Sequence, residues 1–118
     1  MVRQTLEVCA DVEFLIGVGL SHQVLGRIAQ VEEELTEAER HLQEALRTLG
    51  AIGSRFELAR THLDLASLAH ARGDREAAAS QLNEAQALFR ALRVPKYVKR
   101  AAEVAREFGV SLLEQAAG

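Results

Sequence analysis

Four histidines are the residues of this 118-residue chain best suited to bind a metal or carry a phosphoryl group. His62 and His70 lie eight residues apart, whereas two metal ligands on one helix face usually lie four apart. No cysteine or carboxylate stands in register with them, so we expect neither a metal site nor a cofactor. His41 lies between charged neighbours on an expected helix and should be exposed.

His22 is the candidate for a second chemistry, phosphoryl transfer. Residues 22–26, His-Gln-Val-Leu-Gly, are loosely similar to the exposed His-Leu-Lys-Gly segment of histidine phosphotransfer domains, which are helical bundles of about this size. The lysine is missing and the spacing is shifted by one residue. A copy of the segment at residues 62–66, His-Leu-Asp-Leu-Ala, favours instead a packing role between helices for both histidines. A histidine phosphotransfer bundle is the alternative function of a different class.

The other reactive residue types form no catalytic pattern. The single cysteine, Cys9, excludes an internal disulfide and a cysteine-based zinc site, and its apolar neighbours favour a buried position. The acidic run at residues 32–34 is expected to be a solvated helix end. Gly17 and Gly19 are not followed by the Lys-Ser/Thr pair of a phosphate-binding loop. The sequence therefore predicts that the protein is not an enzyme.

Composition predicts a single all-α domain over residues 1–118. Apolar residues make up 48% of the chain and charged residues 26%, with one proline and no tryptophan. The abundant Ala, Leu, Glu and Arg are strong helix formers. The longest apolar run, residues 14–20, is shorter than the roughly 20 residues of a membrane span, and acids among the N-terminal apolar residues make a poor signal peptide. We therefore expect a cytoplasmic protein that binds no membrane.

Charge is unevenly distributed along the chain. The net charge is −3, which argues against general nucleic-acid binding. Residues 1–45 hold nine acids and three bases, whereas residues 46–118 hold eight acids and eleven bases. The densest basic cluster is Arg90, Arg93, Lys96, Lys99 and Arg100. This cluster is either a solvated helix end or an attraction for an acidic partner, including a second copy of the chain bound head to tail.

An internal repeat with a period of 40 runs through the chain. Its matched positions are small or apolar and pair Leu25 with Leu65, Gly26 with Ala66, Ala29 with Ala69, Ala38 with Ala78, Leu42 with Leu82, Ala45 with Ala85 and Leu49 with Phe89. Each unit is expected to be two helices joined by a short turn. Small side chains let the two helices approach closely, and Leu25, Leu42 and Leu49 should fill the groove between them.

Caps and helix breakers predict about six helices in an antiparallel array of helix hairpins. Their expected ranges are 3–10, 11 or 12 to 33, 36–49, 55–71, 74–92 and 95–108, the first two being either continuous or kinked near the glycines at 17 and 19. Thr36, Ser54 and Asp74 are the expected N-caps, and Pro95 suits a first helical turn. The chain then divides into a half-repeat (1–17), two repeats (18–53 and 54–93), a capping helix (94–109) and a tail (110–118).

The matched positions resemble the tetratricopeptide repeat (TPR). The pattern Leu-Gly, Ala, Ala, Leu, Ala of residues 25–45 and its copy carry the likeness, and residues 73–78, Gly-Asp-Arg-Glu-Ala-Ala, resemble the turn and second-helix start of that family. The period is 40 instead of the family's usual 34, which we expect a longer second helix and loop to absorb. Repeats of this length resemble the C-terminal arrays of bacterial signalling ATPases, cyclases and transcriptional regulators. The resemblance implies an α-solenoid that binds proteins.

In such an array the first helix of each pair lines a concave surface that binds a peptide or helix. The matching positions here are Leu20, Gln23, Arg27, Gln30, Arg60, Leu63, Ser67 and His70. Spacings of three and four residues place each set on one stripe of its helix. The stripe mixes arginines, amides and leucines, so the resemblance implies a protein or peptide partner held by both polar and apolar contacts.

The N-terminal segment carries more apolar residues than one helix stripe can bury. Those expected to mediate self-association are Leu6, Cys9, Phe14, Leu15, Ile16 and Val18. A solenoid end without a polar cap exposes apolar surface, so we expect a homo-oligomer. The alternative within the same fold is a purely oligomerising C-terminal segment of a larger signalling protein.

Overall fold

The computed structural model describes the backbone of residues 2–112 and the side chains of residues 11–112. The described part is all-helical and holds five helices, with no strand: α1 (Val2–Val31), α2 (Leu35–Ala51), α3 (Arg55–Ala71), α4 (Arg75–Ala91) and α5 (Pro95–Phe108). None of these helices is long and apolar enough to cross a bilayer, as far as the described residues extend.

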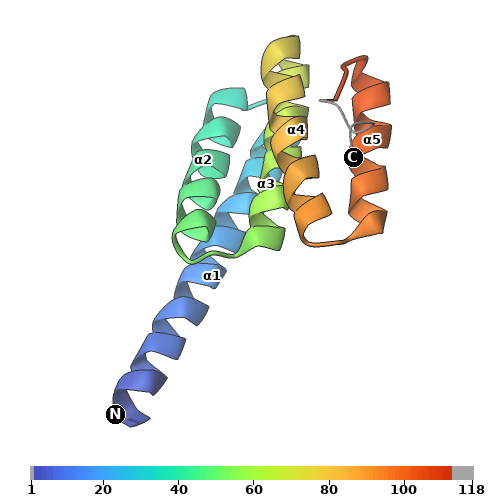
Figure 1. Cartoon of the computed structure of the whole chain (residues 1–118). Coiled ribbons are helices and arrows are strands. Elements are labelled where there is room, and N and C mark those ends of the chain that lie inside the picture. The colour runs from blue at the N-terminus through green and yellow to red at the C-terminus, as the bar shows by residue number, and fades with distance from the viewer. Residues whose placement is uncertain (1, 113–118) are drawn as a thin grey trace.

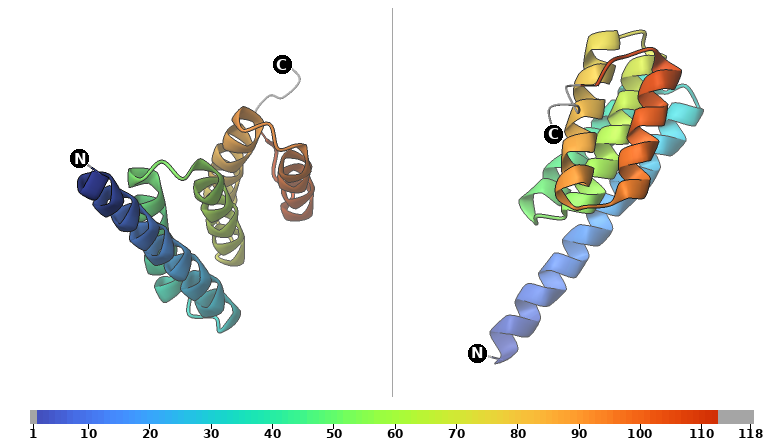
Figure 2. Two further views of the ribbon diagram at one scale, coloured as in Figure 1. Left: turned by 90° about the horizontal axis from the view of Figure 1, so that it is seen from below. Right: turned by 45° about the vertical axis from the view of Figure 1, so that its right-hand side comes forward.

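Successive helices run antiparallel and follow one another across the molecule, from α1 at one end to α5 at the other (Figures 1 and 2). The closest packing joins α1 to α2 and α3 to α4, which makes two helix hairpins. α2 contacts α3 between the hairpins, and α5 packs on α4. The N-terminal part of α1 projects beyond the other helices (Figure 1).

The prediction of six helices is wrong by one, because α1 is continuous from Val2 to Val31. Neither of its first two glycines breaks it. A Cβ atom added at Gly19 would lie 2.7 Å from the Leu49 side chain of α2, so this glycine permits close helix packing. At Gly19 this packing offsets the lower helix propensity of glycine, about 1 kcal/mol, whereas Gly17 meets no neighbouring atom within 4 Å.

Four turns with the same backbone geometry end the helices α1 to α4, at equal intervals along the chain. The residue at the turn has a positive φ in each: 63° at Glu33, 70° at Gly53, 77° at Gly73 and 57° at Arg93. The next amide donates to the carbonyl oxygen five residues back, at 2.8 to 3.1 Å: Glu34 to Ala29, Ser54 to Leu49, Asp74 to Ala69 and Val94 to Phe89. This is the Schellman ending of a helix, in which a left-handed residue closes the last carbonyls.

The helix boundaries confirm some sequence predictions and correct others. α3 has the predicted range, Asp74 caps α4 by accepting from the Ala77 amide at 3.0 Å, and Pro95 opens α5. The predicted cap at Thr36 is wrong, since α2 begins one residue earlier and Glu34 holds the cap position. α3 and α4 have 17 residues each, so the two helices of this hairpin are equal in length.

The core follows the internal repeat. In α2 and α4 the same four positions are fully buried: Ala38, Leu42, Ala45 and Leu49, and then Ala78, Leu82, Ala85 and Phe89. Gly26 of α1 faces the buried residues of α2, and a Cβ atom added to it would lie 2.7 Å from the Leu42 side chain. Leu25, predicted to fill the groove between the helices, is instead 44% exposed, whereas the neighbouring Gly26 meets Leu42 of α2.

We expect Gly26→Ala to lower the free energy of unfolding by about 1 to 3 kcal/mol, since the added methyl group overlaps the buried Leu42. Gly17→Ala is the matched control, because no heavy atom lies within 4 Å of its Cβ position. The control should raise stability by about 0.5 to 1 kcal/mol through helix propensity. Urea unfolding measures both, and a Gly26→Ala chain as stable as Gly17→Ala would contradict the packing.

Glu33 is an L-residue in a conformation that favours glycine, at φ 63°. Left-handed geometry costs an ordinary residue about 1 kcal/mol or more. We therefore expect Glu33→Gly to raise the free energy of unfolding by about 0.5 to 1 kcal/mol. Gly73→Ala, at a turn of the same design, should lower it, and thermal unfolding that moved both variants in one direction would refute the argument.

Candidate functional site: a groove along α1, α3 and α5

A cavity of about 340 Å³ opens along the three alternate helices α1, α3 and α5. Its lining residues are Arg27 from α1; Arg60, Leu63, Asp64 and Ser67 from α3; and Tyr97, Arg100, Val104, Glu107 and Phe108 from α5. We call this cavity the central groove. It is built by the stacking of the hairpins, because stacking brings the first helices of successive units to one wall.

Half of the residues that the sequence assigned to partner binding line the central groove: Arg27, Arg60, Leu63 and Ser67. The contribution of α5 was missed. A signal for it exists in the sequence, since one further period of 40 leads from Arg60 to Arg100 and from Ser67 to Glu107. The repeat therefore extends into α5, and its first helices supply the groove throughout.

The other four predicted binding residues do not line the groove. Gln23 is only 2% exposed, and its Nε2 donates to Thr61 Oγ1 at 2.9 Å and to the Glu57 carbonyl at 3.0 Å. It therefore ties α1 to α3 and is not a free surface amide. Leu20 and Gln30 are half-buried outside the groove, whereas His70 is exposed, with its ring stacked on Phe108 at a centroid distance of 4.0 Å.

An ion pair crosses the groove wall between α1 and α3. Arg27 Nε donates to Asp64 Oδ2 at 2.9 Å, and a second guanidinium nitrogen lies 3.5 Å from Gln23 Oε1. Burial raises the pKa of the Asp64 carboxyl above its usual range, and the charge of Arg27 only partly opposes that shift. Keeping the Asp64 carboxylate charged in this buried position therefore costs free energy, which the positive charge of Arg27 partly offsets.

The remaining arginines of the groove have weaker partners. Arg60 lies 3.4 Å from a carboxylate oxygen of Glu57, and Arg100 lies 4.0 Å from one of Glu107. Solvent-accessible pairs of this kind contribute at most about 1 kcal/mol. A carboxylate from a bound peptide can therefore replace either partner at small cost, while Leu63 and Val104 supply apolar contact.

His22 and His62 occupy equivalent positions of the two repeats. Each contacts the second helix of its own hairpin, at a residue 19 positions further along the chain. His22 Nδ1 lies 3.0 Å from His41 Nδ1, and His62 Nδ1 lies 2.6 Å from Gln81 Oε1. The predicted exposure of His41 is wrong, because this contact holds it half-buried. Within the described side chains, no three histidine, cysteine or acidic residues gather as metal ligands.

The residues assigned to self-association lie on α1, away from the central groove. Phe14 and Leu15 are exposed, Ile16 and Val18 are half-buried, and the side chains of Leu6 and Cys9 lie outside the described residues. The exposed apolar surface continues further than the sequence indicated, through Val24, Leu25, Ile28 and Val31. Leu25 was missed because the sequence pattern assigned it to the core.

Comparison of this chain with protein-family models, with curated proteins and with solved structures found no match.

We expect Asp64→Asn to gain stability relative to the wild type as the pH rises. The folded chain holds the Asp64 proton more tightly than the unfolded chain, so wild-type stability falls as the pH passes upward through the raised folded pKa. The variant has no such titration. Urea unfolding between about pH 3 and pH 7 measures the difference, and a gain that is constant or shrinks with rising pH would contradict it.

Proposed function

We propose that this chain is a protein–protein interaction module that binds a peptide or a helix in the central groove. The observation that carries the proposal is the convergence of Arg27, Arg60, Leu63 and Ser67 with residues of α5 on one cavity of about 340 Å³. The cavity is supplied by α1, α3 and α5, which are the first helices of successive repeat units. Repeat arrays present such a surface to an extended ligand.

The chemistry of the groove favours a ligand with both apolar and acidic side chains. Leu63, Val104 and Phe108 offer apolar contact, and the guanidinium groups of Arg60 and Arg100 are held only by long ion pairs. Arginine binds carboxylates through paired hydrogen bonds, so an acidic residue of the ligand gains specificity as well as energy. No catalytic role is part of the proposal.

The array belongs, by this proposal, to the TPR-like α-solenoids with a long period. The support is internal: turns of one geometry recur at positions 33, 53, 73 and 93, and the buried stripes of α2 and α4 match at a spacing of 40. A unit that contacts only its neighbours and repeats in this way is the building block of a solenoid.

Self-association through α1 is the second part of the proposal. Phe14, Leu25, Ile28 and Val31 leave a contiguous apolar surface on one helix, and a surface of this kind usually meets another protein surface. A segment whose whole role is oligomerisation would use this surface and leave the central groove without a ligand.

The test of the groove is binding to a displayed library of random peptides. Ser67→Trp fills the cavity from α3, and we expect it to weaken selected peptides at least tenfold, about 1.4 kcal/mol. Ser80→Trp is the matched control, because Ser80 is exposed on α4 and does not line the cavity. Fluorescence anisotropy with labelled peptides measures both variants against the wild type.

Two results would defeat the groove proposal. One is a library that yields no peptide with saturable binding to the wild-type chain. The other is a set of peptides that bind Ser67→Trp and Ser80→Trp equally well, which would place their site elsewhere on the surface.

A further inference from the structure

The outer face of α1 is equivalent to a face that α3 buries. Leu25 and Ile28 are 44% and 49% exposed, whereas their counterparts in the next repeat, Leu65 and Leu68, are 4% and 2% exposed. In α3 these leucines pack on the hairpin before them, against Ala29, Ala38 and Leu42. The same positions of α1 have no helix to cover them in the described chain. We call this face the α1 stripe; its residues are Phe14, Ser21, Leu25, Ile28 and Val31, which are exposed, and Val18, which is half-buried.

At the other end of the array, α5 has an open side. α1 pairs with α2 and α3 with α4 along their lengths, but no second helix of this kind follows α5 in the described residues. A groove of about 500 Å³ lies there between α4 and α5, with an apolar wall that includes Val94, Val98 and Ala102. We call it the terminal groove. Its position beside α5 is the one that α2 takes beside α1.

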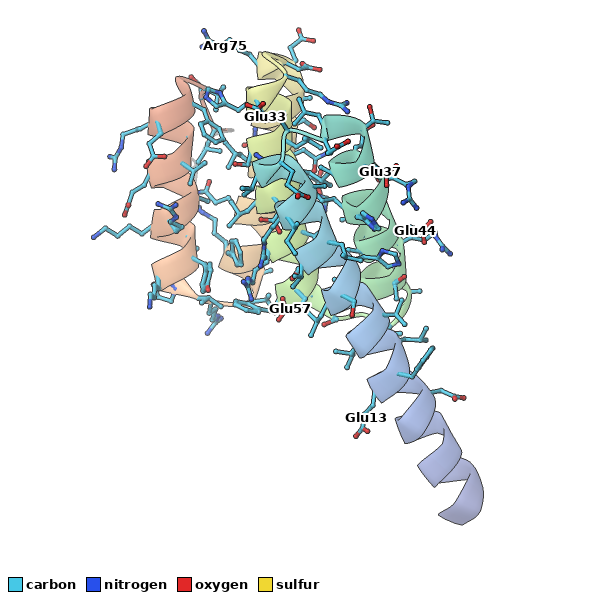
Figure 3. All side chains as sticks on the ribbon, turned by 180° about the vertical axis from the view of Figure 1, so that it is seen from behind. Glu13, Glu33, Glu37, Glu44, Glu57 and Arg75 are labelled. Atoms are coloured by element: carbon cyan, nitrogen blue, oxygen red, sulfur yellow. The ribbon has the colours of Figure 1, made fainter. Side chains whose placement is uncertain are left out.

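The two surfaces carry opposite charges at their rims. The terminal groove is lined by Arg90, Arg93 and Lys99, with no acid among its described lining residues. Glu13 and Glu32 border the two ends of the α1 stripe, and Arg27, which lies near it, is already paired with Asp64. Figure 3 shows Glu13 on the projecting part of α1 and Glu33 at the other end of the helix. An apolar helix with acidic ends thus fits an apolar groove with a basic rim.

The buried amide of Gln86 and the two outer turns of the array are unusual for an isolated chain. Gln86 at the terminal groove is 3% exposed, and its Oε1 has no hydrogen-bond partner within the described residues, which is costly for a buried acceptor. The α1 stripe carries a hydroxyl donor, Ser21, in its middle. The turns at the two ends of the array also place Glu33 and Arg93 in left-handed geometry, where both inner turns have glycine.

We propose that copies of this chain associate head to tail, with the α1 stripe of one copy docked in the terminal groove of the next. The inference rests on the self-association through α1 in the proposed function. It adds the terminal groove as the surface that the α1 stripe contacts. A two-fold contact between two α1 stripes is disfavoured, because antiparallel stripes would bring acidic ends together. A head-to-tail contact uses different surfaces on the two copies, so each copy keeps one free surface and the assembly can grow.

Complementary defects test this arrangement. The first variant, Ile28→Glu, places a charge in the apolar α1 stripe and leaves the terminal groove unchanged. If this variant unfolds, Val31→Glu repeats the test at the most exposed position of the stripe. The other, Arg90→Glu with Lys99→Glu, reverses the rim of the groove at two exposed residues. Arg47→Glu with Arg55→Glu is the matched double reversal, at exposed positions away from α5 that do not line the groove. Circular dichroism verifies that each chain is folded.

Light scattering over a concentration series gives the readout. We expect the wild type and the control reversal to grow beyond a dimer. Each broken variant should stay monomeric at concentrations at least tenfold above the wild-type midpoint. An equimolar mixture of the two broken variants should form a 1:1 dimer and grow no further, because one intact stripe then meets one intact groove.

Three results would overturn the inference, and they separate it from the proposed function. A mixture that stays monomeric would exclude the head-to-tail contact. A groove variant that still dimerises alone would leave self-association through α1 standing but remove the terminal groove from it. A wild-type chain that is monomeric at every concentration would remove both, while peptide binding in the central groove would stand or fall by its own test.

Discussion

The close approach of paired antiparallel helices is the constraint on which the rest of this structure depends. Gly26 meets Leu42 across the first hairpin at a distance that leaves no room for a Cβ atom, and Gly19 meets Leu49 in the same way. The alanines of α2 and α4 keep the spacing small along the remaining length. With the helices this close, buried leucines contact several neighbours at once, and the hairpin gains enough packing to stack regularly.

Regular stacking explains both candidate binding regions without a special device for either. Each hairpin places its first helix beside the first helix of the next, so residues such as Arg60 and Ser67 recur on one wall and form the central groove. The second hairpin also buries Leu65 and Leu68 of α3 against the first hairpin. Stacking therefore buries the apolar surface between neighbouring units and leaves two end surfaces, the α1 stripe and the terminal groove. Nothing in the described chain covers the apolar areas of these two surfaces.

The sequence predicts what depends on local chemistry. The range of α3, the Asp74 cap and the repeated buried stripe follow from capping residues and periodicity. Gln23 could not be placed in this way, because its burial depends on Thr61 and Glu57 of another helix. The continuity of α1 was equally hidden, since a glycine that breaks a helix and a glycine that admits a neighbouring leucine look the same in a sequence.

The two outer turns of the array hold ordinary residues where the two inner turns hold glycine. All four turns need a left-handed residue, and the inner two use Gly53 and Gly73, which adopt it without strain. The outer two use Glu33 and Arg93, each at a cost of about 1 kcal/mol or more. A cost accepted at both ends of the array, by side chains of opposite charge, is unexplained by the fold of one chain. In the proposed head-to-tail assembly, Arg93 lines the terminal groove and Glu33 follows the last residues of the α1 stripe, so both strained residues add charge near the contact.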